Sequence, residues 1–275
     1  MEKSANQKMP TGITSLDPIL DGGVPQGSVI LLLGDLGGGN FEFVYSSIVH
    51  QLSLKKESIQ EGLVLPEEVR YITFTRLKET VKREIMLSFK IEGLTEKIES
   101  IQFNDLSEHY FDNSIVPDGW YSHSDIITRL QKRSGHESIL VKLANVINEA
   151  KPNSLIIFDS ITEIASLATS PADWQNLAGF LRGLQRVSKQ RNLTCYLLLS
   201  LGILDSSKER ELSDIADAVM LFKWEETAGA RRQRVMYFEK FRGVMPHLEE
   251  RDLVKFAVRI NTVEGFEVSN IRVII

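Results

Sequence analysis

The sequence predicts an α/β protein in which a mostly parallel central sheet is flanked by helices and ends in an antiparallel extension. Three observations predict it. Short apolar runs bounded by glycine or polar residues are typical of strands buried on both faces. These runs alternate with stretches whose apolar residues recur at helical spacing. After about residue 218 the pattern changes to closely spaced short strands, and we interpret residues 1–275 as one domain.

Two strand–helix pairs open the predicted sheet. Val29 to Leu33 is a continuous apolar run, and residues 41–54 follow it with apolar side chains at helical spacing. Arg70 to Thr75 is rich in β-branched and aromatic residues, which favour strands. The charged segment 77–89 comes next and carries an apolar stripe, which predicts an amphipathic helix.

The middle of the chain continues this alternation. The expected elements are a helix through 139–147, a strand at 155–158, a helix that begins at Ser170-Pro171 and a strand at 193–200. Ser170 is expected to cap its helix, because Asp173 stands three residues further on.

The other segments lie beyond this alternation or interrupt it. Short antiparallel strands are predicted at 219–223, 234–239, 253–260 and 266–275. Residues 98–135 are rich in Asp, Ser, His and aromatic side chains, and we interpret them as an insertion at the edge of the sheet.

The composition is that of a folded protein of the reducing cytoplasm. The formal net charge is -5, so no global basic field attracts nucleic acid, and we expect no nucleic-acid partner. Cys195 is the only cysteine, which excludes an intramolecular disulfide and a cysteine-based metal site. No uncharged stretch approaches the roughly 20 apolar residues of a membrane span, and the start of the chain is polar. We therefore expect a cytoplasmic protein with no membrane contact.

A glycine-rich loop follows the first long strand and has the frame of a phosphate-binding loop. It reads Gly34-Asp35-Leu36-Gly37-Gly38-Gly39-Asn40-Phe41, between a strand and a helix. In the full motif, G-x-x-x-x-G-K-[ST], backbone N–H groups surround the phosphates, the lysine reaches the terminal phosphates and the hydroxyl holds Mg²⁺. Here Asn40 replaces the lysine and Phe41 replaces the hydroxyl residue. Losing both groups is expected to weaken triphosphate binding severely.

Motifs spread along nearly the whole chain fit one known family. The opening segment carries Thr11-Gly12-Ile13, Leu16-Asp17, Leu20, Gly22-Gly23, Pro25 and Gly27-Ser28. Later motifs are Ile157-Phe158-Asp159-Ser160, residues 216–221, residues 234–243 and Val263-Glu264-Gly265-Phe266. Together they resemble the KaiC-type ATPases of the RecA superfamily. The resemblance implies a RecA-like P-loop fold, ring or filament assembly, and a Walker B position for Asp159.

A third departure from that family follows the strand at 70–75. KaiC-type ATPases carry paired glutamates after a T-F motif, and one of them activates the attacking water. This chain reads Thr73-Phe74-Thr75-Arg76, so a hydroxyl and a cation replace the two carboxylates. Neither takes a proton from water near neutral pH. We therefore expect no catalytic residue and an inactivated ATPase site.

Asp159 needs a new partner if the metal is lost, because a buried carboxylate without one is costly or becomes protonated. In the RecA-like fold, the strand that leads to Arg76 runs beside the strand that carries Asp159. One hypothesis is therefore an Arg76–Asp159 ion pair or hydrogen-bond network across the former metal site. The alternative is that Asp159 caps the following turn or helix through Ser160.

The glycine loop itself has two interpretations. Its backbone donors and the positive end of the next helix favour weak binding of ATP or another nucleotide. Alternatively, Gly37-Gly38-Gly39 is only a tight strand-to-helix turn that binds nothing. We expect no cofactor, and because the five histidines show no metal-binding spacing we expect no metal either.

Two basic segments remain. Lys240-Phe241-Arg242-Gly243 resembles the K-x-R-G element with which KaiC-type rings reach a neighbouring subunit's nucleotide, so Lys240 and Arg242 could act in trans. The alternative is a solvated strand end. Arg231, Arg232 and Arg234 lie beside a Gly-Ala turn and form either a solvated hairpin tip or a local nucleic-acid contact.

These observations predict a catalytically inactive KaiC- and RecA-like ATPase homologue that acts as a regulatory or structural interaction subunit, for example in signal transduction. Its expected partners are copies of itself or other RecA- and KaiC-like proteins. One alternative is a nucleotide-binding ATPase with a non-standard loop, in which Asn40 bonds phosphate and Lys78 or Lys240 replaces the missing lysine. Another is a recombination accessory protein, like the non-catalytic RecA paralogues, that binds single-stranded DNA through its arginine cluster.

Overall fold

The computed structural model describes residues 7–54, 60–112, 114–121, 138–227 and 231–270. In chain order its elements are β1 (Lys8–Met9), β2 (Val24–Pro25), β3 (Val29–Gly34), α1 (Asn40–Gln51), β4 (Val69–Thr73), α2 (Lys78–Ser88), α3 (Leu94–Glu99), β5 (Gln102–Asp105), α4 (Ser107–Phe111), the 3₁₀ helix η3 (Asp118–Trp120), α6 (Ile139–Glu149), β6 (Leu155–Asp159), α7 (Ile161–Leu167), α8 (Pro171–Arg191), β7 (Thr194–Ser200), α9 (Ser206–Ile215), β8 (Ala218–Thr227), β9 (Arg231–Phe241), α10 (Met245–Glu250), β10 (Lys255–Asn261) and β11 (Gly265–Asn270).

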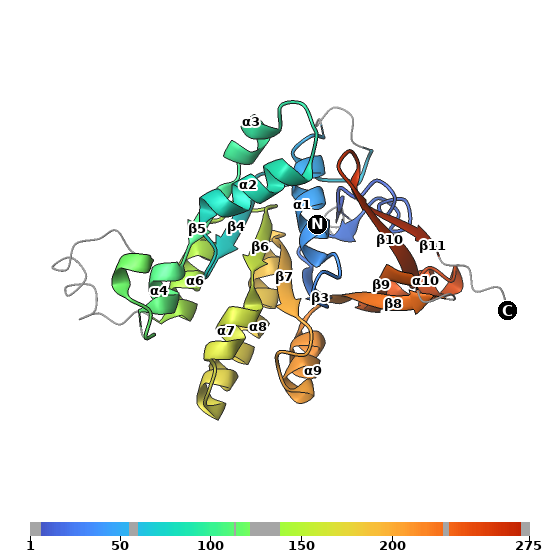
Figure 1. Cartoon of the computed structure of the whole chain (residues 1–275). Helices are drawn as coiled ribbons and strands as arrows, with labels where there is room; N and C mark the ends of the chain where they lie inside the picture. The colour runs from blue at the N-terminus through green and yellow to red at the C-terminus, as the bar shows by residue number, and fades with distance from the viewer. Residues whose placement is uncertain (1–6, 55–59, 113, 122–137, 228–230, 271–275) are drawn as a thin grey trace.

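One nine-stranded sheet organises the molecule (Figure 1). Its strand order is β11-β10-β9-β8-β3-β7-β6-β4-β5. The strands from β8 to β5 in that order are parallel, and β9, β10 and β11 are antiparallel additions at one side. This arrangement confirms the predicted fold class.

Helices cover both faces of the sheet. Side chains of α1, α2 and α3 pack on one face, and side chains of α6, α7, α8 and α9 pack on the other. Every residue of β3, β4 and β6 is buried, as the apolar runs predicted for strands covered on both sides. The predicted start of α8 is also confirmed, since Ser170 accepts from the backbone N–H of Asp173 in a capping box.

The segment interpreted as an insertion contributes a strand to the sheet itself. Strand β5 pairs in parallel with β4, from Arg70 opposite Gln102 to Thr73 opposite Asp105. Residues 102–105 therefore form the edge of the core sheet, and α4 follows them directly. Residue 113 and residues 122–135 of the interpreted insertion lie outside the described residues, as do residues 271–275 of the last predicted strand.

The C-terminal extension packs against α1 and so lies beside the glycine loop. The backbone N–H of Phe266 donates to Ser46 Oγ at 2.8 Å. Gly265 has a φ of +71°, and a Cβ there would lie 2.4 Å from Ser46 Oγ. The Phe266 ring also lies next to Gly39, where a Cβ would meet it at 3.3 Å. Only glycine fits at position 265, because both its conformation and its surroundings exclude a side chain.

Candidate functional site

The glycine loop connects β3 to α1 and is tightly folded. The backbone N–H of Gly38 donates to the carbonyl of Asp35 at 2.8 Å. Gly39 precedes α1 with a φ of +113°, which glycine adopts readily. The side chain of Asn40 folds back against Gly34, where a Cβ would lie 2.5 Å from Asn40 Cγ. The two ends of the loop therefore close on each other.

The β8–β9 hairpin holds the loop from outside. Trp224 Nε1 donates to the carbonyl of Leu36 at 3.3 Å, and Arg234 Nε donates to the carbonyl of Gly37 at 2.9 Å. The guanidinium carbons of Arg232 and Arg234 lie 5.0 and 4.3 Å from the centroid of the Trp224 ring. The side chain of Leu36, at the tip, is fully exposed. The hairpin thus fixes a loop that presents an apolar side chain to solvent.

The start of α1 offers hydrogen-bond donors that the protein leaves free. Within the described ranges, the backbone N–H groups of Gly39, Asn40 and Phe41 donate to no protein acceptor. Asn40 is 6 % exposed, and its side chain bonds to no other described residue. Because Arg234 lies beside these donors, the loop could hold a phosphate-sized anion.

The cations expected to replace the missing lysine lie elsewhere. Lys78 Nζ is 5.8 Å from the Phe103 ring, at the far edge of the sheet. Lys240 is bonded to the end of α9, as described below. Sequence reasoning missed Arg234 as a loop contact because it stands 197 residues from Gly37 and only the hairpin register brings it there.

Arg76 lies between the carboxylates of Asp159 and Glu84. Its Nη1 donates to Asp159 Oδ2 at 2.7 Å, and its Nη2 donates to Glu84. The guanidinium carbon lies 5.3 Å from the centroid of the Phe41 ring. The hypothesis of an Arg76–Asp159 ion pair is confirmed. The neighbouring Thr75, half-buried, supplies no carboxylate either.

Two tyrosines complete the arrangement. Tyr71, on β4, donates its hydroxyl to Asp159 Oδ2 at 2.6 Å, and Tyr45, on α1, donates to Glu84 Oε2 at 2.9 Å. We call the set of Tyr45, Tyr71, Arg76, Glu84 and Asp159 the Arg76 network. It joins α1, α2, β4 and β6 through hydrogen bonds between side chains.

The alternative prediction was that Asp159 caps the following helix through Ser160. The cap is present, but Asp159 does not form it. Ser160 does cap α7, because its side chain accepts from the N–H of Thr162 at 3.2 Å and forms a capping box with Glu163. The carboxylate of Asp159 takes no part in that cap and bonds to Arg76 and Tyr71 instead.

Burial dominates the ionisation of the Arg76 network. The side chain of Asp159 is 2 % exposed, and this desolvation raises the pKa of Asp159 against the opposing effects of Arg76 and Tyr71. Desolvation also raises the pKa of Tyr71 and of Tyr45, so both keep their protons. Burial alone would lower the pKa of Arg76, but the charge of Asp159 and its other neighbours raise it, so the guanidinium stays charged.

The K-x-R-G cations contact their own chain. Lys240 Nζ donates to the carbonyls of Ser213 and Asp214 at 2.9 and 2.7 Å, and Arg242 Nη2 donates to the carbonyl of Asp214 at 2.7 Å. Cations at these last carbonyls stabilise the end of α9. Partial burial lowers the pKa of Lys240. Both residues therefore act within the chain, and a contact in trans stays a prediction.

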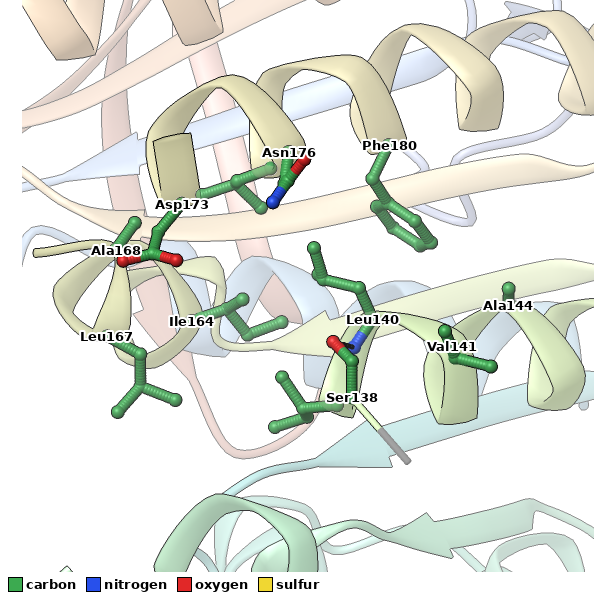
Figure 2. A pocket seen from close by; sticks show the side chains of 12 residues that line it. Ser138, Leu140, Val141, Ala144, Ile164, Leu167, Ala168, Asp173, Asn176 and Phe180 are labelled. Carbon is green, nitrogen blue, oxygen red and sulfur yellow. Dashed lines mark hydrogen bonds between the residues drawn. The ribbon is translucent and has the colours of Figure 1, made fainter. Parts of the chain in front are cut away.

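Described residues line two sizeable pockets. One, of about 390 Å³, opens beside Arg76, between Phe41 and Glu84. The other, of about 620 Å³, lies between α6, α7 and α8 (Figure 2). Figure 2 shows Leu140, Ile164 and Phe180 around this second pocket. It contains none of the predicted site residues.

The described residues hold neither a metal-binding cluster nor a helix that could span a membrane. Across the part of the chain that the structure describes, no group of three or more His, Cys, Asp or Glu side chains could hold a metal ion. No helix among the described residues is long and apolar enough to cross a bilayer.

Comparisons with known proteins place this geometry in context. The KaiC ATPase family model matches residues 9–268. A crystal structure of the KaiC-like protein PH0186 from Pyrococcus horikoshii OT3 is similar at 19 % identity, with a TM-score of 0.60, over 96 % of this chain and 99 % of that one. The flagellar accessory protein FlaH from Methanocaldococcus jannaschii is similar at 13 % identity, with a TM-score of 0.61, over 94 % and 96 % of the two chains. No curated protein matches the sequence.

Proposed function

The chain belongs to the KaiC ATPase family, and from this premise we propose that it no longer hydrolyses ATP and acts as a regulatory or structural interaction subunit. The observation that carries the proposal is the ion pair between Arg76 and Asp159, at 2.7 Å. In this pair the charged guanidinium of Arg76 stands where hydrolysis needs a base. It also bonds the carboxylate of Asp159, which would otherwise face the metal.

The size of the chemical deficit supports this proposal. Asn40 is neutral, Phe41 has no oxygen ligand, and Arg76 accepts no proton. A hydrogen bond from a charged group contributes roughly 1.5 to 3 kcal/mol, and general-base catalysis contributes about 10² to 10⁴ in rate. Because these losses multiply, we expect turnover at the rate of the uncatalysed background.

The loop surface supports an interaction role. Leu36 is fully exposed, and the hairpin contacts of Trp224 and Arg234 hold the loop that carries it. Trp224 and Arg234 are partly exposed, and tryptophan and arginine side chains on a preformed surface are enriched in protein contacts. The proposal assigns this surface to self-association or to contact with another KaiC- or RecA-like protein, in the cytoplasm and within a signalling function.

Nucleotide binding without turnover is a second candidate function. Arg234 beside Gly37 and the free N–H groups at the start of α1 favour it. On this account the loop binds ATP or another nucleotide weakly, as an effector.

Phosphate release from ATP tests the main proposal. Purified protein with ATP and Mg²⁺ should release phosphate at the same background rate as the Asp159→Asn variant. A rate above background that Asp159→Asn abolishes would show that the site is active and refute the proposal.

Light scattering after size exclusion tests the interaction role. We expect the chain, alone or with a co-purified KaiC-like partner, to form an oligomer that Leu36→Glu weakens. Leu54→Glu is the matched control, because Leu54 is also an exposed leucine, at 44 %, and follows the C-terminal end of α1, whereas the loop precedes its N-terminal end. Equal effects of the two substitutions would exclude the loop tip as the contact.

A further inference from the structure

The second pocket is an apolar groove among the helices that cover one face of the sheet. It has a volume of about 620 Å³ and is lined by α6, α7 and α8 (Figure 2). Val141, on α6, and Leu167, on α7, line it and are 50 % and 42 % exposed. Exposed apolar side chains that gather around a groove are typical of an interaction site. The groove therefore suits an apolar partner.

We propose that this groove receives the Leu36 loop tip of a second copy of the chain, in a head-to-tail contact. The inference rests on the proposed function, because it names the partner of the loop surface and the patch on that partner. It adds a direction to the association, since each copy offers its loop at one place and its groove at another. A contact between two different patches continues from copy to copy, into a ring or a filament.

The loop has the shape of a tip that can enter a groove. Leu36 is fully exposed. Residues 37–39 are glycines, so no side chain from them widens the tip. The hydrogen bonds from Trp224 and Arg234 to the loop carbonyls hold it in place. A preformed tip loses little conformational entropy when it binds.

The tip and the groove meet between copies rather than within one chain. The loop leads into α1, whose side chains pack on one face of the sheet, whereas α6, α7 and α8 cover the other face. Because Leu36 is fully exposed, it does not enter the groove of its own chain. A volume of about 620 Å³ is more than one leucine side chain fills, so the groove also has room for the glycine backbone that follows.

The charges beside the tip and beside the groove are opposite. The guanidinium groups of Arg232 and Arg234 lie over the Trp224 ring next to the loop, and neither forms an ion pair within the described residues. Asp35 of the loop directs its Oδ2 to the backbone N–H of Trp224. Among the described residues that line the groove, Asp173 alone is charged. Hydrogen bonds from the capping serine of α8 lower the pKa of Asp173, so its carboxylate is ionised at neutral pH. Complementary charges of this kind orient two partners.

Mixing two variants tests the proposal, with light scattering after size exclusion as the measurement. Leu36→Glu disrupts the tip and leaves the groove intact, whereas Val141→Glu disrupts the groove and leaves the tip intact. Each variant alone should be monomeric at a concentration at which the wild-type chain associates. An equal mixture should form a one-to-one dimer, because the intact tip of one variant enters the intact groove of the other.

Matched substitutions control for the added charge. Leu54→Glu and Val263→Glu change an exposed leucine and an exposed valine, at 44 % and 60 %, outside the tip and the groove. Both should associate as the wild-type chain does. Circular dichroism checks that each variant is folded, and Leu167→Glu, at another half-exposed position of the groove, takes the place of Val141→Glu if that variant is not.

Higher salt should weaken the wild-type association, because it screens the attraction between the two arginines and Asp173. A wild-type chain that stays monomeric, an association that salt leaves unchanged, a folded groove variant that still associates, or a mixture that forms no dimer would each overturn the inference. If Leu36→Glu prevents association and the groove variants do not, the tip contacts another surface, and the proposed function stands without this inference. Phosphate release that Asp159→Asn abolishes would refute the proposed loss of hydrolysis and leave the mixing result unaffected.

Discussion

Replacing Arg76 with alanine should destabilise the protein by about 3 kcal/mol in the absence of divalent ions. Removing one partner of a buried ion pair costs about 3 to 5 kcal/mol, because the remaining charge is left uncompensated. The side chain of Asp159 is 2 % exposed, so it belongs to that class. Glu84 is 41 % exposed and its pair adds at most about 1 kcal/mol, while the bond from Tyr71 to Asp159 persists and offsets part of the loss.

The loss should also depend on pH in a defined direction. Burial raises the pKa of Asp159 above its unfolded value, so its favourable contribution to stability is largest below the unfolded pKa and is lost as pH rises through the folded pKa. Without Arg76 this pKa rises further, because the guanidinium no longer favours the carboxylate. The difference in free energy of unfolding between Arg76→Ala and the wild-type chain should therefore be smaller at about pH 5 than at about pH 8.

Urea unfolding followed by circular dichroism measures both quantities. Arg83→Ala is the matched control, because Arg83 lies exposed on α2 and makes no ion pair or hydrogen bond within the described part of the chain; its effect should stay within about 0.5 kcal/mol. A loss below about 1 kcal/mol for Arg76→Ala, or a loss with no pH dependence, would refute the reasoning.

Three further substitutions test other contacts. Tyr71→Phe removes a donor from a buried carboxylate and should cost about 1 to 3 kcal/mol in the same urea experiment; a loss below about 0.5 kcal/mol would show that the bond is unimportant. Trp224→Ala should speed amide hydrogen exchange in residues 35–38 without changing global stability, and unchanged exchange would contradict the role given to the hairpin. Gly265→Ala places a Cβ 2.4 Å from Ser46 Oγ at a φ of +71°, so it should destabilise the chain by about 2 to 5 kcal/mol, and a neutral effect would contradict the packing described.

The sequence predicted the sheet and its helices because their signals are local. Apolar runs such as Val29 to Leu33 and the cap at Ser170 depend on neighbouring residues, and both were confirmed. The pair of Arg76 and Asp159 could also be predicted, since adjacent parallel strands bring the ends of β4 and β6 together. Strand β5 was missed, because its short sequence of mixed polarity resembles a surface insertion.

The rest of the site depends on register and side-chain reach. Tyr71 reaches Asp159 across 88 positions of sequence, and Arg234 reaches Gly37 across 197. No local sequence pattern predicts either contact, because Tyr71 and Arg234 are both ordinary residues for the strands in which they lie. The contacts of Lys240 and Arg242 with α9 were missed for the same reason, since the motif alone does not say which carbonyls lie within reach.

Equilibrium binding of a fluorescent ATP analogue, with Mg²⁺ and with EDTA, tests most directly whether an internal ion pair has replaced the metal. The account predicts the same weak or undetectable binding in both solutions, because Arg76 and Phe41 leave the metal no ligands. Binding that Mg²⁺ tightens by roughly tenfold or more would contradict it, since a gain of about 1.4 kcal/mol requires a metal held between the protein and the phosphates.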